Sequence, residues 1–172
     1  MTISAQLESI SSQDGNGSVA EGIHREVIFP ASGAGVALVS RQLKAEESGA
    51  LIIAGSATGS LFTLPTPVAG MWFEYEVTIA ASSNEHKVIT NSITTEFLVG
   101  AVISASATVA EGMDCFVADG TANAVSISMN GTTTGGAVGT RLVFTAISTT
   151  QWFVKGVNQG SGGAVTDPFD AS

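Results

Sequence analysis

The clearest pattern in the chain is a two-residue alternation of apolar and polar side chains over residues 71–79. One set is Met71, Phe73, Tyr75, Val77 and Ile79, and the other is Trp72, Glu74, Glu76 and Thr78. Successive side chains of a β-strand point to opposite faces, so the stretch predicts a half-buried strand whose first set faces the core.

A turn rich in proline precedes this strand. The segment from Leu64 to Pro67 contains two prolines, which lack backbone N–H donors, and Gly70 can adopt backbone angles closed to other residues. We expect a short strand over 61–64 to stop there and the chain to reverse into the strand over 71–79. Residues 47–91 are therefore predicted to form a strand meander around which the other strands are arranged.

Short apolar runs separated by turn residues continue along the rest of the chain. Further strands are predicted over 26–29, 36–40, 51–53, 87–93, 97–104, 125–129, 141–147 and 151–157, the last two joined as a hairpin in which Trp152 is an anchor. Residues 41–47 predict a single helical turn or a polar loop. No apolar repeat of helical period persists for three turns, so we predict an all-β protein with a single antiparallel β-sandwich or barrel-like domain.

The run FLVGAVIS over residues 97–104 is almost continuously apolar. Such a run indicates a strand that is covered on both faces, by its own core on one side and by another layer or subunit on the other. It is therefore the predicted subunit contact.

The two ends of the chain have the composition of linkers. Residues 1–22 contain SSQDGNGS and predict a flexible N-terminal arm, residues 23–158 the β-sandwich body, and residues 159–172 a C-terminal tail. In the tail, Val165 and Phe169 are the side chains able to dock on the body.

Composition limits what the domain can bind. The chain has 172 residues, of which 44% are hydrophobic and only 12% charged. One core is expected, with a surface of small neutral side chains that favours assembly. The net charge of −9 argues against binding to nucleic acid or to an anionic membrane. There is no long apolar run and no signal-like start, so we expect a soluble product made without export.

Candidate catalytic and metal-binding residues do not form a known pattern. His24 and His86 lack a metal-ligand spacing and are expected in loops or on the surface, and Cys115 is expected to be a small buried residue. No GxSxG nucleophile motif is present. We therefore expect no catalytic residues, no cofactor and no metal.

Three weaker motifs leave alternatives open. Glu74 and Glu76 form a carboxylate pair, but a solvent-facing or interface position is favoured. Calcium binding by Glu111, Asp114 and Asp119 competes with ordinary capping of turns. The loop GSATGS over residues 55–60 lacks the lysine of a phosphate-binding loop, and an ordinary turn is favoured.

Several short motifs occur in an order that resembles a known family. They are SGALII, GSLFTLPTPVAG, WFEYEV, HKVI, NGTTTGGAVGTRLVF and QWFVKGV, which together span about Ala45 to Val157. The most telling are Ser48-Gly49, Thr63 to Pro65 with Gly70, and the hairpin strand from Trp152 to Gly156. In this order the chain resembles the head decoration, or cement, proteins of tailed bacteriophages, and related strand modules also occur in phage fibres and tails.

The resemblance implies a non-enzymatic protein that binds the outside of a phage head and clamps neighbouring major capsid subunits. Its implied partners are the major capsid protein and further copies of itself, as a homotrimer at three-fold positions, and its implied location is the virion exterior. The expected subunit-interface residues are Phe97, Leu98, Val99, Val102 and Ile103. The expected capsid contacts are Ile3, Leu7, Ile10 and Arg25.

Three other functions remain open. A phage tail or fibre module would present its glycine-rich loops to a host receptor. A carbohydrate-binding module would use exposed aromatic side chains, for which Trp72 and Trp152 are the candidates, although a core position is favoured for each. An enzyme would need an arranged nucleophile, base or metal site, which the sequence does not show.

Overall fold

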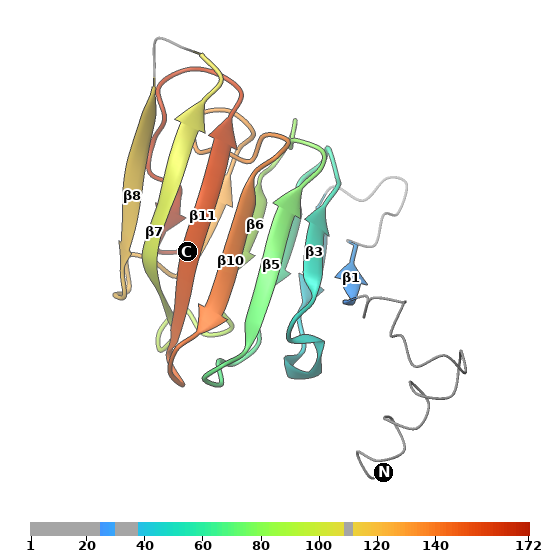
Figure 1. Ribbon diagram of the computed structural model, residues 1–172, viewed down its shortest axis with the longest axis vertical. Coiled ribbons are helices and arrows are strands. Elements are labelled where there is room, and N and C mark those ends of the chain that lie inside the picture. Colours follow the sequence, from blue (N-terminus) through green and yellow to red (C-terminus); the bar gives the residue numbers. More distant parts are fainter. Residues whose placement is uncertain (1–24, 30–37, 109–111) are drawn as a thin grey trace, which may run out of the picture.

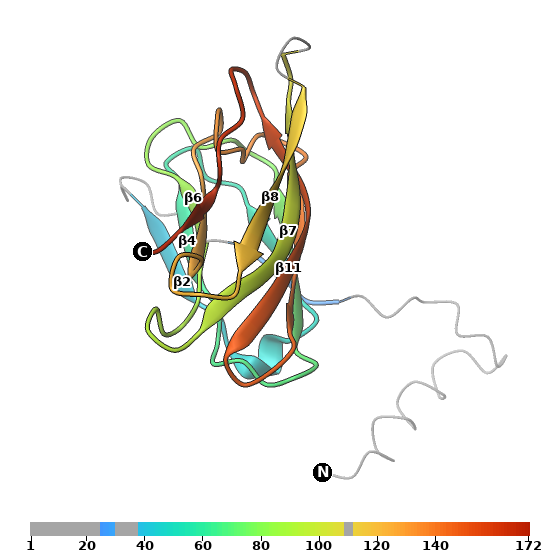
Figure 2. The same cartoon turned by 90° about the vertical axis from the view of Figure 1, so that its left-hand side faces the viewer.

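The computed structural model describes residues 25–29, 38–108 and 112–172, and within them the protein is a sandwich of two β-sheets (Figures 1 and 2). The predicted all-β sandwich is therefore confirmed. The predicted arm of residues 1–22, with Ile3, Leu7 and Ile10, lies outside the described residues.

The larger sheet has seven strands in the order β1-β3-β5-β10-β11-β7-β8. They are β1 (Val27–Ile28), β3 (Leu51–Ala54), β5 (Trp72–Val77), β10 (Arg141–Ala146), β11 (Gln151–Gly160), β7 (Phe97–Ser106) and β8 (Met113–Asp119). The smaller sheet has five strands in the order β12-β9-β6-β4-β2. They are β12 (Phe169–Asp170), β9 (Ser126–Met129), β6 (His86–Ile89), β4 (Ser60–Thr63) and β2 (Val39–Gln42).

Both sheets are mixed, whereas the sequence predicted antiparallel pairing. From β1 to β7 the chain alternates between the sheets, and each crossing reverses its direction, so strands that return to the same sheet run parallel. The parallel pairs are β1–β3, β3–β5, β2–β4, β4–β6 and β7–β11. The predicted hairpin of β10 and β11 is antiparallel and is confirmed.

The proline-rich turn does not join two paired strands. Strand β4 pairs with β2 and β6 in the smaller sheet, and β5 pairs with β3 and β10 in the larger one. The turn instead carries the chain across the edge of the core, and its end is fixed by a hydrogen bond of 2.9 Å from the Gly70 N–H to the Ala146 carbonyl. The predicted meander is therefore wrong, although its strands exist.

The core lies between the two sheets and is built from the inward-facing residue of each alternating pair. Phe73, Tyr75 and Val77 are buried, as the pattern over 71–79 predicts, but the prediction is wrong for Ile79, which lies past the end of β5 and is 46% exposed. Trp152 is fully buried, and its ring lies 5.9 Å from that of Phe73, centroid to centroid. The predicted anchor in β11 is therefore confirmed.

The remaining predicted elements fit the sheets, but the structure has two strands, β8 and β12, that the sequence did not predict. Residues Ala45–Glu47 form a single turn of 3₁₀-helix, η1, which agrees with the helical turn expected there. The segment assigned to a tail begins inside β11 and ends in β12, which pairs antiparallel with β9. Val165 is buried, and Phe169 packs against the core.

Candidate interaction surface

The outward side of the larger sheet carries an apolar area over β11, β7 and β8. Registered neighbours in this area are Phe153 beside Val99, Val157 beside Ile103, and Ala101 beside Val117. We call this area the outer apolar face, and its apolar residues are Phe97, Val99, Ala101, Ile103, Met113, Val117, Phe153 and Val157. The exposed Lys155 lies on the same row of β11, between Phe153 and Val157.

Several side chains of this face are open to solvent although they are large and apolar. Ile103 is 44% exposed, Val157 43% and Val117 66%. Single exposed apolar residues are ordinary in soluble proteins, whereas a set gathered on three adjacent strands makes this face a candidate interaction surface. Within the described ranges no other part of the chain covers this face.

The face contains three of the five predicted subunit-contact residues. Phe97, Val99 and Ile103 lie on it, while Leu98 and Val102 are fully buried in the core between the sheets. The continuous run FLVGAVIS hid this division, because both faces of β7 carry apolar side chains. Leu98 and Val102 therefore support the core, and their side chains are not available to a neighbouring subunit.

Sequence reasoning missed the contributions of β8 and β11. The segment containing β8 was interpreted through its acidic residues. The side chains of Met113, Cys115 and Val117 nevertheless alternate with those of Asp114, Phe116 and Ala118, which lie on the other face of the sheet. Phe153 and Val157 were assigned to a hairpin strand without a face. The signal was present as a period of two, but nothing in it indicates which strand lies beside which.

A charged cluster borders the face on the side of β5 and β10. The Glu74 carboxylate accepts hydrogen bonds from both Arg25 and Arg141, and the Arg25 guanidinium lies 5.9 Å from the centre of the Trp72 ring. Burial acts to raise the pKa of Glu74, but the hydrogen bonds and positive charges of the two arginines outweigh it and lower the pKa overall. Glu74 therefore stays ionised and is not a candidate general acid.

This cluster changes the interpretation of two predictions. Glu74 is only 9% exposed, so of the two positions expected for it the solvent-facing one is wrong, and the interface position stays a prediction. Arg25, the expected capsid contact, ties the start of the described chain to β5 through Glu74. Trp72 is half exposed at 37% and lies against Arg25, while Trp152 is buried, so the two aromatics do not form a common platform for a sugar ring.

His86 forms a buried polar pair with Ser60, contrary to the expected surface position. Its Nδ1 lies 2.8 Å from the Ser60 hydroxyl and its Nε2 lies 2.7 Å from the Ile79 carbonyl oxygen. A carbonyl can only accept, so Nε2 carries the proton and Nδ1 accepts from Ser60. Burial lowers the pKa of His86, although the hydrogen bond to the Ile79 carbonyl acts in the opposite direction. The lowered pKa keeps the imidazole ring neutral.

The pair resembles a nucleophile and base but lacks access. Ser60 and His86 are both fully buried, and so is the neighbouring Tyr75, whose pKa is raised by burial. A substrate cannot reach a hydroxyl enclosed between two sheets. The arrangement therefore satisfies polar groups inside the core.

The acids of residues 111–119 do not form a calcium site in the part of the chain that is described. Glu111 lies outside that part, and the Asp119 carboxylate accepts hydrogen bonds from the Thr121 N–H at 3.0 Å and hydroxyl at 2.6 Å, which lower its pKa. No group of three or more metal-ligating side chains occurs in the described ranges. Cys115, expected to be buried, is exposed on β8, because its side chain is on the outward row.

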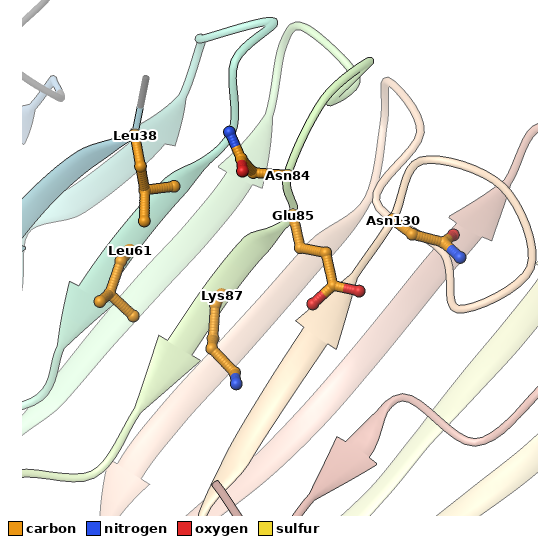
Figure 3. Close-up of a pocket in the computed structure, with 6 residues that line it drawn as sticks. All are labelled: Leu38, Leu61, Asn84, Glu85, Lys87 and Asn130. Carbon is orange, nitrogen blue, oxygen red and sulfur yellow. The ribbon is translucent and has the colours of Figure 1, made fainter. Parts of the chain in front are cut away.

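The smaller sheet carries a shallow open groove of about 510 Å³ on its outer side (Figure 3). It is lined by Leu38, Leu61, Asn84, Glu85, Lys87 and Asn130. The Lys87 ammonium is engaged elsewhere, since it donates to the main-chain oxygen of Ser172 at 2.5 Å and lies 3.7 Å from the Asp170 carboxylate. The groove thus lacks a convergent set of polar groups that would hold a small ligand.

Comparisons of this chain with family models, with curated proteins and with solved structures give no match. In the described ranges, no helix is both long enough and apolar enough to cross a membrane.

Proposed function

We propose that this protein is a non-enzymatic structural protein of a tailed-bacteriophage virion, which decorates the outside of the head and stabilises it by clamping major capsid subunits. The outer apolar face carries the proposal. It offers a set of exposed apolar side chains on a rigid sheet, with no partner among the described residues, and it includes the strand in which the sequence placed a subunit contact. The motif order along the body supplies the virion context.

Self-association is the first step of the proposed mechanism. Copies of the chain form a homotrimer through Phe97, Val99 and Ile103, which share the outward side of β7. Around a closed three-fold axis the same contact is repeated, so each copy contacts both of its neighbours. The sheet supports the contact rigidly, because β7 is hydrogen-bonded on one side to β11 and on the other to β8.

Binding to the shell is the second step. Many weak contacts repeated at equivalent positions give avidity without a deep pocket. The expected capsid contacts are in the arm of residues 1–22 and at Arg25. Because Arg25 already binds Glu74 and lies against Trp72, its contact with the capsid would use the part of the guanidinium that remains exposed.

A binding role is supported by the chemistry of the described residues. The Ser60–His86 pair is enclosed in the core, the Glu74 carboxylate is held by two arginines, and Asp119 caps a turn. Each of these groups thus has a structural partner or is inaccessible to a substrate. Catalysis needs such groups arranged around an accessible cavity.

The test is to add the purified protein to heads that lack a decoration protein. We expect copies that associate about a three-fold axis, saturate the shell at symmetric positions and raise the temperature at which the heads rupture. Ile103→Asp should prevent the trimer and weaken binding, because it places a charge in the apolar contact. Ile93→Asp is the matched control, since Ile93 is 48% exposed in the loop after β6, close to the 44% of Ile103.

Two results would overturn the proposal. A protein that ignores every decoration-free head would remove the clamp function, and equal effects of the two aspartate variants would remove the outer apolar face as the contact. Location of the labelled protein at the tail would favour the alternative, a tail or fibre module that binds a host receptor.

A further inference from the structure

The four outer strands of the two sheets differ sharply in how they are protected. Strands β1 and β12 have two residues each, and β2 has four and carries Arg41. Strand β8 has seven residues, MDCFVAD, with no lysine, arginine or proline, and it forms one lateral edge of the larger sheet (Figure 1). Short strands, charged side chains, above all lysine, and proline are the usual protection of sheet edges against foreign strands. Among the four, β8 is the longest and has neither a basic residue nor a proline, and its charged side chains are Asp114 and Asp119.

The hydrogen bonds around β8 show which of its backbone groups are satisfied. The Ser106 N–H donates to the Gly112 carbonyl, and the Gly120 N–H donates to the Leu98 carbonyl, each at 3.0 Å. In an antiparallel ladder, hydrogen-bonded pairs alternate with non-bonded ones. The even-numbered residues of β8 therefore bond to β7, whereas the backbone N–H and C=O groups of Met113, Cys115, Val117 and Asp119 point to the open edge.

Those outward groups have no hydrogen-bond partner within the described residues. They form a regular row of donors and acceptors, four residues with a period of two. The side chains of Met113 and Val117 are 69% and 66% exposed. Strand β12 of the smaller sheet approaches β8 but forms no ladder with it, so the row of outward groups stays open. This row matches one kind of ligand, an extended strand.

We propose that β8 pairs antiparallel with the β8 of a second copy about a two-fold axis at Phe116, so that two larger sheets become one continuous sheet. A two-fold contact requires a surface that is complementary to itself, and this register meets the requirement. Cys115 faces the partner's Val117, and Met113 faces the partner's Asp119. Asp114 faces the partner's Ala118, and Phe116 faces the partner's Phe116.

The register explains why a second copy fits this edge. In this register the odd-numbered residues of the two strands form the hydrogen-bonded pairs, so every outward donor meets an acceptor. The pairing covers all seven residues of each strand. No carboxylate faces another carboxylate, although the chain has a net charge of −9. The edge is distinct from the outward side of β7, so the pairing can coexist with the three-fold contact and does not depend on the proposed function.

A proline at position 115 tests the edge itself. The Cys115 N–H points away from β7, so Cys115→Pro removes a donor of the edge and leaves the ladder within the monomer intact, at a residue outside the set that defines the outer apolar face. Cys115→Thr is the matched control, because it keeps the N–H and a side chain of similar size. We expect light scattering to show that the proline variant has half the mass of the unaltered protein, while the threonine variant keeps the mass and both variants keep the circular dichroism of the folded sheets.

Disulfide formation tests the register. In a hydrogen-bonded antiparallel pair the two Cα atoms lie about 5.5 Å apart, which suits a disulfide. Val117→Cys, with Cys115 retained, should form covalent dimers at least about tenfold faster than single-cysteine chains, because pairing raises the local thiol concentration. The single-cysteine chains are the unaltered protein and the double variant Cys115→Ser with Val117→Cys.

The outcomes separate the edge from the three-fold contact. Equal rates in all three proteins, or a mass that Cys115→Pro does not change, would overturn the edge pairing and leave the trimer and shell-binding results untouched. Fast linkage of the unaltered protein would place the axis at Cys115, and fast linkage of the double variant would place it at position 117. Either result would overturn the register centred on Phe116.

Discussion

Gly100 in the middle of β7 should be among the least replaceable residues of the sheet. It has a φ of +125°, and a Cβ atom there would lie 2.3 Å from the Val154 carbonyl oxygen and about 3.0 Å from the Phe153 ring. Contact between carbon and a carbonyl oxygen is normally about 3.3 Å or longer. Gly100→Ala therefore forces β7 and β11 apart by about 1 Å at the pair Gly100–Val154, within the parallel ladder that joins the two strands.

The cost can be built from three parts. The positive φ costs an alanine about 1–2 kcal/mol, overpacking against rigid backbone adds about 1–3 kcal/mol, and a weakened ladder bond adds about 1 kcal/mol. We expect Gly100→Ala to lower the free energy of unfolding by about 3–6 kcal/mol, a large share of the roughly 5–15 kcal/mol that is typical of a domain. Gly70→Ala isolates the first part, because Gly70 has a φ of +96° and nothing lies within 4 Å of its Cβ position.

Urea unfolding followed by circular dichroism gives both values. Gly70→Ala should cost about 1–2 kcal/mol, since only the backbone strain applies. Equal costs for the two variants would refute the reasoning, because they would show that the sheet relaxes around the added methyl group without loss.

Three further predictions follow from buried charged and polar groups and from the C-terminal strand. Glu74→Gln should lower the free energy of unfolding in urea by about 1–2 kcal/mol, a modest figure because solvent screens the two arginines. The control, Glu76→Gln, should cost less, and an equal cost would contradict a stabilising role of the ion pairs of Glu74. The pKa of His86 is lowered from its ordinary value of 6.5, so the unfolded state binds the proton more readily than the folded state. The free energy of unfolding should therefore fall as the pH drops from 6.5 to about 5. A melting temperature that is flat or rises over that range would count against it. Deletion of residues 169–172 removes β12 and uncovers Ser126 and its neighbours on β9, so the melting temperature should fall by several degrees; an unchanged value would show that β12 contributes nothing to the fold.

The local pattern predicted the strands better than it predicted their partners. The alternation over 71–79 identified the buried side of β5 because burial of alternate residues follows directly from strand geometry. It could not show that β4 and β5 belong to different sheets. A proline-rich turn stops a strand whether the chain returns along the same sheet or crosses to the other one, and only the packing of the whole core distinguishes the two.

The candidate surface was predicted in part for the same reason. The run over 97–104 indicated a strand with two apolar sides, and Phe97, Val99 and Ile103 do lie on an exposed face. Its neighbours on that face come from β8 and β11, which are adjacent to β7 in space through one antiparallel and one parallel pairing. The buried position of His86 was likewise unpredictable, because its partners Ser60 and Ile79 belong to other segments.

The larger sheet places the proposed functions on surfaces that variants can separate. Arg25 and β1 lie at one edge, the three-fold contact lies on the outward side of β7, and β8 forms the opposite edge. Because the strand order keeps these surfaces apart, a change to one should leave the others working. Deletion of residues 1–22 should therefore abolish binding to phage heads while both self-association contacts persist. Loss of the trimer in that deletion would show that the arm, and not the side chains of β7, holds the copies together.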